Sequence, residues 1–302
     1  MPIMPAEIKE VAEQTYACDC GRDPVFDLRQ VAYILTGETP VIIDPGSTSA
    51  AKEILAGCHH LGLAPEDFAY IIPTHIHLDH AGGAGYLAKM LPESKIILHP
   101  KGVVHMIDPA RMVQSFRMVF GNNFEDTLGP VLPVPQENVM IASDGQEISL
   151  GQRTLSIYFA PGHATHHIAI RDSLTRGLFC GDALGYIADE TPDVPFPVGL
   201  PPFDPEAYLE TIDKLARLSP EIIFYAHHGA KTGVQRLVTM VREICTAYAE
   251  IIRKALKAGE DQETINERIR RFSSGYSPER DIPAIVEASI SGYTDFYGRN
   301  AR

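Results

Sequence analysis

Three histidines and an aspartate fall within six residues, and this cluster constrains the fold of the chain more than any other feature. The stretch Thr74-His75-Ile76-His77-Leu78-Asp79-His80 directly follows a run of apolar, β-branched residues. Imidazole nitrogens and carboxylate oxygens are the ligands that zinc and similar divalent metals prefer. A tight turn after a strand can direct alternate side chains to two adjacent positions. We therefore expect His75 and His77 to face one metal, and Asp79 and His80 to face the next.

Four further acidic or imidazole positions lie at the ends of apolar runs elsewhere in the chain. They are Asp44, His163, Asp182 and His227. Each alone would be an ordinary turn residue, but together with the first cluster they complete a two-metal site. Because His228 directly follows His227, the residue pattern alone leaves the last position open between the two.

Strands and helices alternate along the rest of the chain. Short β-branched runs and a helical pattern near 49–62 occupy the first half, and closely spaced strands follow from about 139 to 181. A proline-rich loop covers 185–205. This order of strands and helices predicts an α/β domain over 1–230. Helices with alternating charge then form a C-terminal extension over 231–302, which we expect to pack on the same domain.

The composition excludes several classes of partner. The chain has 26 Lys and Arg against 39 Asp and Glu, a net charge of −13, and a field of that sign repels a phosphate backbone. We therefore expect a small-molecule substrate and no nucleic acid. Five cysteines without a CxxC pair indicate a reduced compartment. With no apolar run near the roughly 18 residues of a transmembrane helix and no visible secretory signal, we expect a cytoplasmic protein without a membrane partner.

The order of these motifs resembles the metallo-beta-lactamase superfamily. Its pattern is an Asp after an early strand, then HxHxDH, and then His, Asp and His at later strand ends. The resemblance covers about residues 28–230 and is closest to lactonase-like and glyoxalase II-like members. It implies an αββα four-layer sandwich, in which two mixed sheets pack face to face and the metal site lies at one edge.

The resemblance also implies a ligand set. It assigns His75, His77 and His163 to one metal and Asp79, His80 and His227 to the other, with Asp182 as the bridge. Related hydrolases carry His-aromatic-Gly at the last position, so we prefer His227 over His228. Asp44 is expected to hold the metal-binding loop by hydrogen bonding. His167 either supports the site in the same way or is a structural histidine.

Two divalent metals at such a site predict hydrolysis. Zinc is the first choice, and iron, manganese or cobalt also suit these ligands. Two adjacent metals lower the pKa of a bridging water and polarise a carbonyl. We predict a dinuclear hydrolase that acts on a lactone or other small carboxylic ester through a metal-bridging hydroxide, with Asp79 or else Asp182 as the proton shuttle. A thioester hydrolase similar to glyoxalase II is the alternative, followed by an iron-dependent redox enzyme of the same fold.

Three aromatic residues are candidates for the substrate pocket. Phe116 and Phe120 lie in a Phe- and Met-rich helical region, and Tyr186 lies in the proline-rich loop. Acyl-homoserine lactonases carry a pocket tyrosine three residues after the bridging Asp, where this chain has Gly185. The substrate is therefore left open. Tyr186 either donates to the substrate or packs as a loop residue, and both segments either wall the pocket or form a homodimer surface.

Overall fold

The computed structural model describes residues 7–23, 28–121, 123–187, 193–276 and 284–300. The chain divides into two units. Unit 1 consists of Met1–Phe159, Ile168–Gly181 and Ile222–Lys231, and unit 2 consists of Ala160–His167, Asp182–Glu221 and Thr232–Arg302. The domain boundary expected at residue 230 stays a prediction.

Two mixed sheets form unit 1, and the first of them has seven strands within the described ranges. Their order follows the sequence: β1 (Glu7–Ala12), β2 (Thr15–Asp23), β3 (Leu28–Leu35), β4 (Val41–Ile43), β5 (Tyr70–Ile72), β6 (Lys95–Leu98) and β7 (Val139–Ile141). Strands β1 to β4 pair antiparallel, whereas β4 to β7 pair parallel. Parallel strands end at the same edge of a sheet. The residues that follow β4 and β5 therefore emerge side by side.

The second sheet has six strands in the described part of the chain. Their order is β15 (Gly229–Lys231), β14 (Ile222–Tyr225), β11 (Gly177–Gly181), β10 (Ile168–Asp172), β9 (Thr154–Phe159) and β8 (Glu147–Ser149). Only β11 and β14 pair parallel among these described strands. The sequence grouped residues 139–141 with these closely spaced strands, but β7 pairs with β6 in the first sheet.

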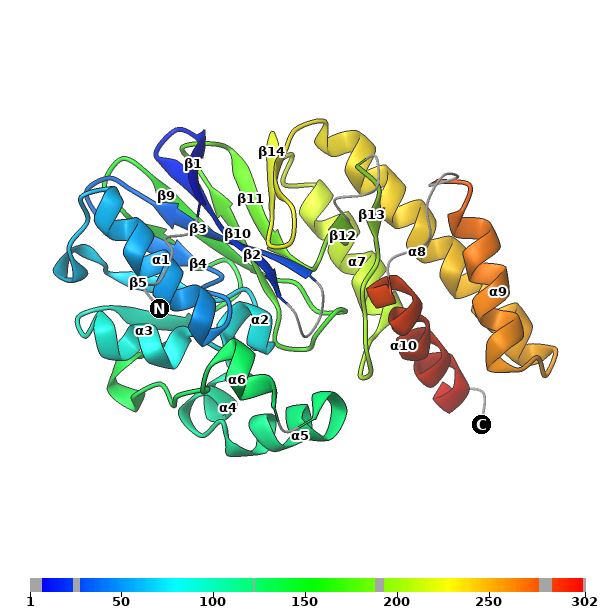
Figure 1. Ribbon diagram of the computed structural model, residues 1–302. Coiled ribbons are helices and arrows are strands. Elements are labelled where there is room, and N and C mark those ends of the chain that lie inside the picture. The colour runs from blue at the N-terminus through cyan, green and yellow to red at the C-terminus, as the bar shows by residue number, and fades with distance from the viewer. Residues whose placement is uncertain (1–6, 24–27, 122, 188–192, 277–283, 301–302) are drawn as a thin grey trace. The chain divides into compact units, whose positions relative to one another are not determined.

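Apolar side chains of the two sheets meet in one core. Residues of the first sheet such as Tyr33 and Ile72 cluster with residues of the second such as Ile157 and Phe179. A second cluster joins the other face of the first sheet to α1 (Thr48–His60) and α3 (Ala84–Met90). Figure 1 shows these two helices alongside the first sheet. The α/β class with two face-to-face mixed sheets is therefore confirmed.

Shorter helices complete unit 1 between the strands. Within the described residues they are α2 (Leu78–Ala81), α4 (Val103–Ile107), α5 (Ala110–Phe120) and α6 (Phe124–Leu128), with 3-10 turns η1 (Pro65–Asp67) and η2 (Gln136–Asn138). Helices α4 to α6 form the connection that carries the chain from β6 to the parallel strand β7.

Helices dominate unit 2. They are α7 (Pro205–Ala216), α8 (Val234–Lys257), α9 (Gln262–Ser273) and α10 (Ala284–Asn300), and a short hairpin of β12 (Tyr186–Ile187) and β13 (Pro195–Phe196) lies within the proline-rich loop. Asp204 caps α7 by accepting from the main-chain N–H groups of Glu206 and Ala207. No helix in the described ranges is long and apolar enough to cross a membrane.

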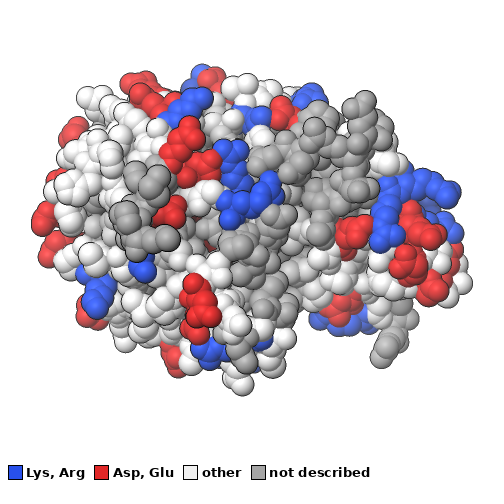
Figure 2. Space-filling model, in the orientation of Figure 1, with Lys and Arg blue, Asp and Glu red and all other residues white. Residues whose placement is uncertain are grey.

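The alternating charges of α9 lie at the surface of unit 2. Figure 2 shows Lys, Arg, Asp and Glu side chains intermixed at the right end of the visible face. Arg270 pairs with both Glu263 and Glu287, and Arg268 pairs with Glu260. Because exposed pairs of this kind contribute about 0–1 kcal/mol each, they keep the surface hydrated rather than hold the fold.

A buried ion pair beside the second sheet also contacts the first sheet of unit 1. Arg153 is 3% exposed, and its Nη2 atom lies 3.3 Å from Oδ2 of the fully buried Asp172. The same guanidinium donates to the carbonyl oxygens of Glu13 and Gln14 and to Oγ1 of Thr15, in the turn between β1 and β2. Burial lowers the pKa of Arg153, whereas the Asp172 carboxylate raises it.

Replacing Arg153 with methionine should lower the free energy of unfolding by roughly 3–5 kcal/mol, because the Asp172 carboxylate would stay buried without its cation. Arg242→Met is the matched control, since Arg242 pairs with Asp213 at an exposed position. That change should cost less than about 1 kcal/mol. Urea denaturation of both variants measures the difference. Equal losses of stability would contradict the assigned role of Arg153.

Candidate metal centre

The histidine cluster lies where β5 gives way to the one-turn helix α2. Ile76 and Leu78 are buried, each within an apolar cluster of unit 1. Side chains alternate in direction along an extended segment. His75 and His77 therefore point away from those apolar neighbours, and the local apolar pattern presents the two imidazoles together.

Glycine allows this loop to approach the start of α1. A Cβ atom on Gly83 would lie 2.6 Å from Cβ of Ala51 and 2.7 Å from the carbonyl oxygen of Ser47. The Gly83 N–H donates to the Gly46 carbonyl, and the Gly46 N–H donates to the His80 carbonyl. These main-chain bonds hold α2 against the segment that follows β4.

The ligand atoms of unit 1 converge closely. Nε2 of His75 lies 2.9 Å from Nδ1 of His77, and Nε2 of His80 lies 3.1 Å from Nε2 of His227. Oδ2 of Asp79 is 3.6 Å from His80 Nε2 and 3.5 Å from His227 Nε2. Asp79, His80 and His227 offer ligand atoms within 4.8 Å of one another, so this group could hold a metal ion.

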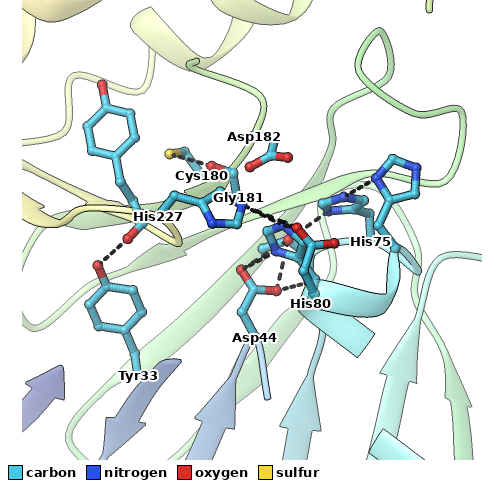
Figure 3. A network of polar contacts seen from close by, with 12 residues as sticks. Tyr33, Asp44, His75, His80, Cys180, Gly181, Asp182 and His227 are labelled. Carbon is cyan, nitrogen blue, oxygen red and sulfur yellow. Dashed lines mark hydrogen bonds and ion pairs between the residues drawn. The ribbon is translucent and has the colours of Figure 1, made fainter. Parts of the chain in front are cut away.

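Strand β3 fixes the position of His227. The hydroxyl of Tyr33 donates to the Tyr225 carbonyl at 2.7 Å, and the Val31 N–H donates to the Ala226 carbonyl at 2.7 Å. Nδ1 of His227 lies 2.8 Å from the Arg29 carbonyl oxygen. Alternate residues of one strand thus hold three consecutive residues, and Figure 3 shows Tyr33 directed at the main chain beside His227. Burial raises the pKa of Tyr33 well above its usual value, so it stays a donor.

The same contact sets which nitrogen of the His227 ring faces the cluster. A carbonyl oxygen can only accept, so Nδ1 of His227 carries the proton and Nε2 presents its lone pair to the cluster. His75 and His80 are arranged alike, with Nδ1 lying 3.2 Å from Oγ1 of Thr74 and 3.4 Å from Oδ2 of Asp44, respectively. Metal-binding histidines characteristically turn their second nitrogen toward a carboxylate, carbonyl or other protein partner.

Asp44 connects the end of β4 to the histidine loop. It is 4% exposed and accepts from the main-chain N–H of Thr74 at 2.7 Å and from the Thr74 hydroxyl at 2.9 Å. Its φ of 49° lies in the left-handed region, which aspartate tolerates better than most residues. Figure 3 shows the carboxylate facing His80 and the neighbouring loop. Asp44 therefore orients the loop that carries the imidazoles.

Unit 2 brings together three other predicted residues. Nε2 of the buried His163 lies 3.3 Å from Oδ2 of the buried Asp182. Nδ1 of His163 donates to the Val198 carbonyl at 2.8 Å, so Nε2 is the ring nitrogen that faces Asp182. The Asp182 N–H donates to Nε2 of His167 at 3.2 Å, so His167 contacts the main chain of Asp182.

The candidate pocket residues lie in apolar surroundings. Phe116 is half-buried, with its ring centroid 4.8 Å from that of Phe124. Tyr186 is buried on β12, opposite Phe196. The side chain of Phe120 lies outside the described residues. The assignment of these three residues to a substrate pocket stays a prediction.

Sequence reasoning missed the partners that orient the imidazoles. Thr74 directly precedes the cluster and was not singled out. The carbonyl groups of Arg29 and Val198 also hold ring nitrogens. Main-chain oxygens occur at every residue, so no side-chain pattern marks them.

Comparisons with known proteins agree with this geometry. Residues 26–227 match the metallo-beta-lactamase superfamily. The chain is 27% identical over 211 residues to an atrochrysone carboxyl ACP thioesterase of Aspergillus fumigatus, covering 68% of this chain and 53% of that protein, so it spans about half of that relative. It is 23% identical over 256 residues to a hydroxyacylglutathione hydrolase of Yersinia pestis, covering 83% and 76%.

A solved structure shows the same fold over nearly the whole chain. It is a metallo-beta-lactamase family protein from Thermus thermophilus, with a TM-score of 0.70 and 20% identity. The match covers 95% of this chain and 94% of that one. The likeness therefore includes the C-terminal helices as well as the two sheets.

Proposed function

The chain belongs to the metallo-beta-lactamase superfamily, and on that premise we propose that this metal-dependent hydrolase acts on a lactone or other small carboxylic ester. One observation carries the proposal: Nε2 of buried His80 and Nε2 of buried His227 face each other at 3.1 Å beside the Asp79 carboxylate. Two ring nitrogens that face each other beside a carboxylate form a set of ligand atoms suited to a cation.

The donor set of the whole chain fits two divalent ions, with zinc as the first choice. We propose seven ligands for them, namely His75, His77, Asp79, His80, His163, Asp182 and His227. When bound, such ions supply Lewis acidity, which polarises a carbonyl and acidifies water. The Nδ1 contacts of His75, His80, His163 and His227 support this assignment, because they leave each Nε2 as the ligand atom.

The carboxylates of the chain would handle the proton. We assign its delivery to the leaving oxygen to Asp79, and Asp182 is the second choice. The net charge of −13 disfavours phosphodiester substrates. A small-molecule substrate, the lack of a nucleic-acid partner and a homodimeric state stay predictions.

Thioester hydrolysis is the second candidate. It is favoured by the names of two relatives, a thioesterase and a hydroxyacylglutathione hydrolase. An ester and a thioester share the acyl group, which the same site would bind. They differ in the leaving group, which is an alcohol in one and a thiol in the other. The two candidates therefore share one site and are separated by substrate alone.

The test is a substrate panel with zinc-reconstituted protein. Proton release reports hydrolysis of lactones, thiol release reports hydrolysis of thioesters, and the His163→Ala variant is the control. Lactone turnover that the variant loses would support the proposal. Turnover of thioesters only would replace it with the second candidate. No turnover of either class by protein that holds two metals would overturn both.

A further inference from the structure

The last described helix, α10, packs on a segment that is distant in sequence but belongs to the same unit. The main-chain N–H of Gly199 donates to Oγ of Ser289 at 3.2 Å. Ser289 is fully buried and donates in turn to the Ile285 carbonyl of its own helix. The rings of Phe203 and Tyr293 lie 4.8 Å apart. The helix therefore holds the segment 198–203 through both polar and apolar contacts.

Gly292 makes this close approach possible. A Cβ atom at this position would lie 2.2 Å from the carbonyl oxygen of Gly199 and 2.8 Å from Cβ of Phe203. The first contact is with main chain, which cannot rotate away as a flexible side chain can. At Gly298, in the same helix, an added Cβ atom would meet nothing within 4 Å. The two glycines thus differ in what they touch while sharing the same helix.

The opposite side of this segment touches the predicted ligands of unit 2. The carbonyl of Val198, next to Gly199, accepts the Nδ1 proton of His163 at 2.8 Å. Phe203 packs on Tyr208 with ring centroids 5.4 Å apart, and the Tyr208 hydroxyl donates to the Asp182 carbonyl at 2.9 Å. Two short chains of contacts therefore run from α10 to His163 and to Asp182.

We propose that α10 is a positioning element of the metal centre, which orients His163 and Asp182 through the segment 198–203 and Tyr208. The inference rests on the proposed function, in which both residues are ligands. A metal-binding histidine needs its second nitrogen held, and loss of such a contact lowers metal affinity about 10–100-fold. The C-terminal helix thereby acts on the site without supplying a ligand.

The test compares Gly292→Ala with Gly298→Ala in the full chain. We measure zinc affinity by competition with a chelator and the visible spectrum of the cobalt-substituted protein. Gly292→Ala should bind zinc about 10–100-fold more weakly and change the cobalt spectrum, because the added methyl group displaces Val198 from His163. Gly298→Ala should match the wild type in both. Wild-type affinity and spectrum in Gly292→Ala would overturn the inference.

If Gly292→Ala does not fold, Ser289→Ala tests the same contact between α10 and the segment 198–203. It removes the acceptor of the Gly199 N–H and adds no bulk, and Ser291→Ala, at an exposed position of α10, is its control. Weaker zinc binding in Ser289→Ala alone would support the inference, and equal binding in both would overturn it. A wild-type protein that binds no metal would overturn the proposed function as well, whereas two metals bound equally by all variants would overturn only the role of α10.

Discussion

Replacing His227 with alanine should lower hydrolytic activity by roughly 10³-fold, because a metal site supplies several kcal/mol of transition-state stabilisation. The same change should remove one metal per chain. Nε2 of His227 faces His80 and Asp79, and Nδ1 of His227 is held by the Arg29 carbonyl. An alanine at this position would leave Asp79 and His80 as the remaining members of this ligand group.

His228→Ala is the matched control for this prediction, because the neighbouring imidazole is half-buried and has no place in the ligand group of unit 1. It should keep both metals and activity within a few-fold of wild type. Turnover with both variants, together with their metal content by mass spectrometry, measures the difference. If His228→Ala lost activity and His227→Ala kept it, the ligand assignment at this strand end would be reversed.

Asp182→Ala should abolish turnover and release metal. In the proposed site this carboxylate would bind metal and offset its positive charge, so its loss would weaken metal binding. Three contacts hold Asp182 in position. Its N–H donates to His167, its carbonyl accepts from Tyr208, and its Oδ2 lies 3.3 Å from His163 Nε2.

Asp213→Ala is the control for the change in charge, since Asp213 is 43% exposed and pairs with Arg242 at the surface. It should retain full activity and both metals. Metal content and turnover are measured on the two variants under one set of conditions. Full activity in the Asp182→Ala protein would contradict the proposal of a dinuclear site.

The hydrophobic pattern of the sequence was sufficient to predict most of the strands and helices. Runs such as 41–43 and 96–98 are continuously apolar because parallel strands are covered on both faces. Strands β1 and β2 went unpredicted, since Glu7–Ala12 is a largely exposed edge strand and alternates poorly. Strand β15 was also missed, because Gly229–Lys231 contains no β-branched or aromatic residue. The pairing of β7 depended on long-range contacts that no local pattern records.

The candidate ligands were predictable from residue type and place, because three imidazoles and a carboxylate fall within six residues and the others follow apolar runs. Their orientation was not predictable. Nδ1 of His227 is held by a carbonyl 198 residues away, and Nδ1 of His163 by one 35 residues away. Such contacts arise from the tertiary fold. The sequence therefore indicates the candidate ligands, and the structure shows the contacts that orient them.

The metal content of the purified protein, measured together with hydrolysis before and after chelation, tests whether this hydrolase depends on metal ions. We predict two divalent ions per chain, loss of acyl hydrolysis when a chelator removes them, and recovery when zinc is restored. Undiminished hydrolysis by the metal-free protein would contradict a metal-dependent mechanism.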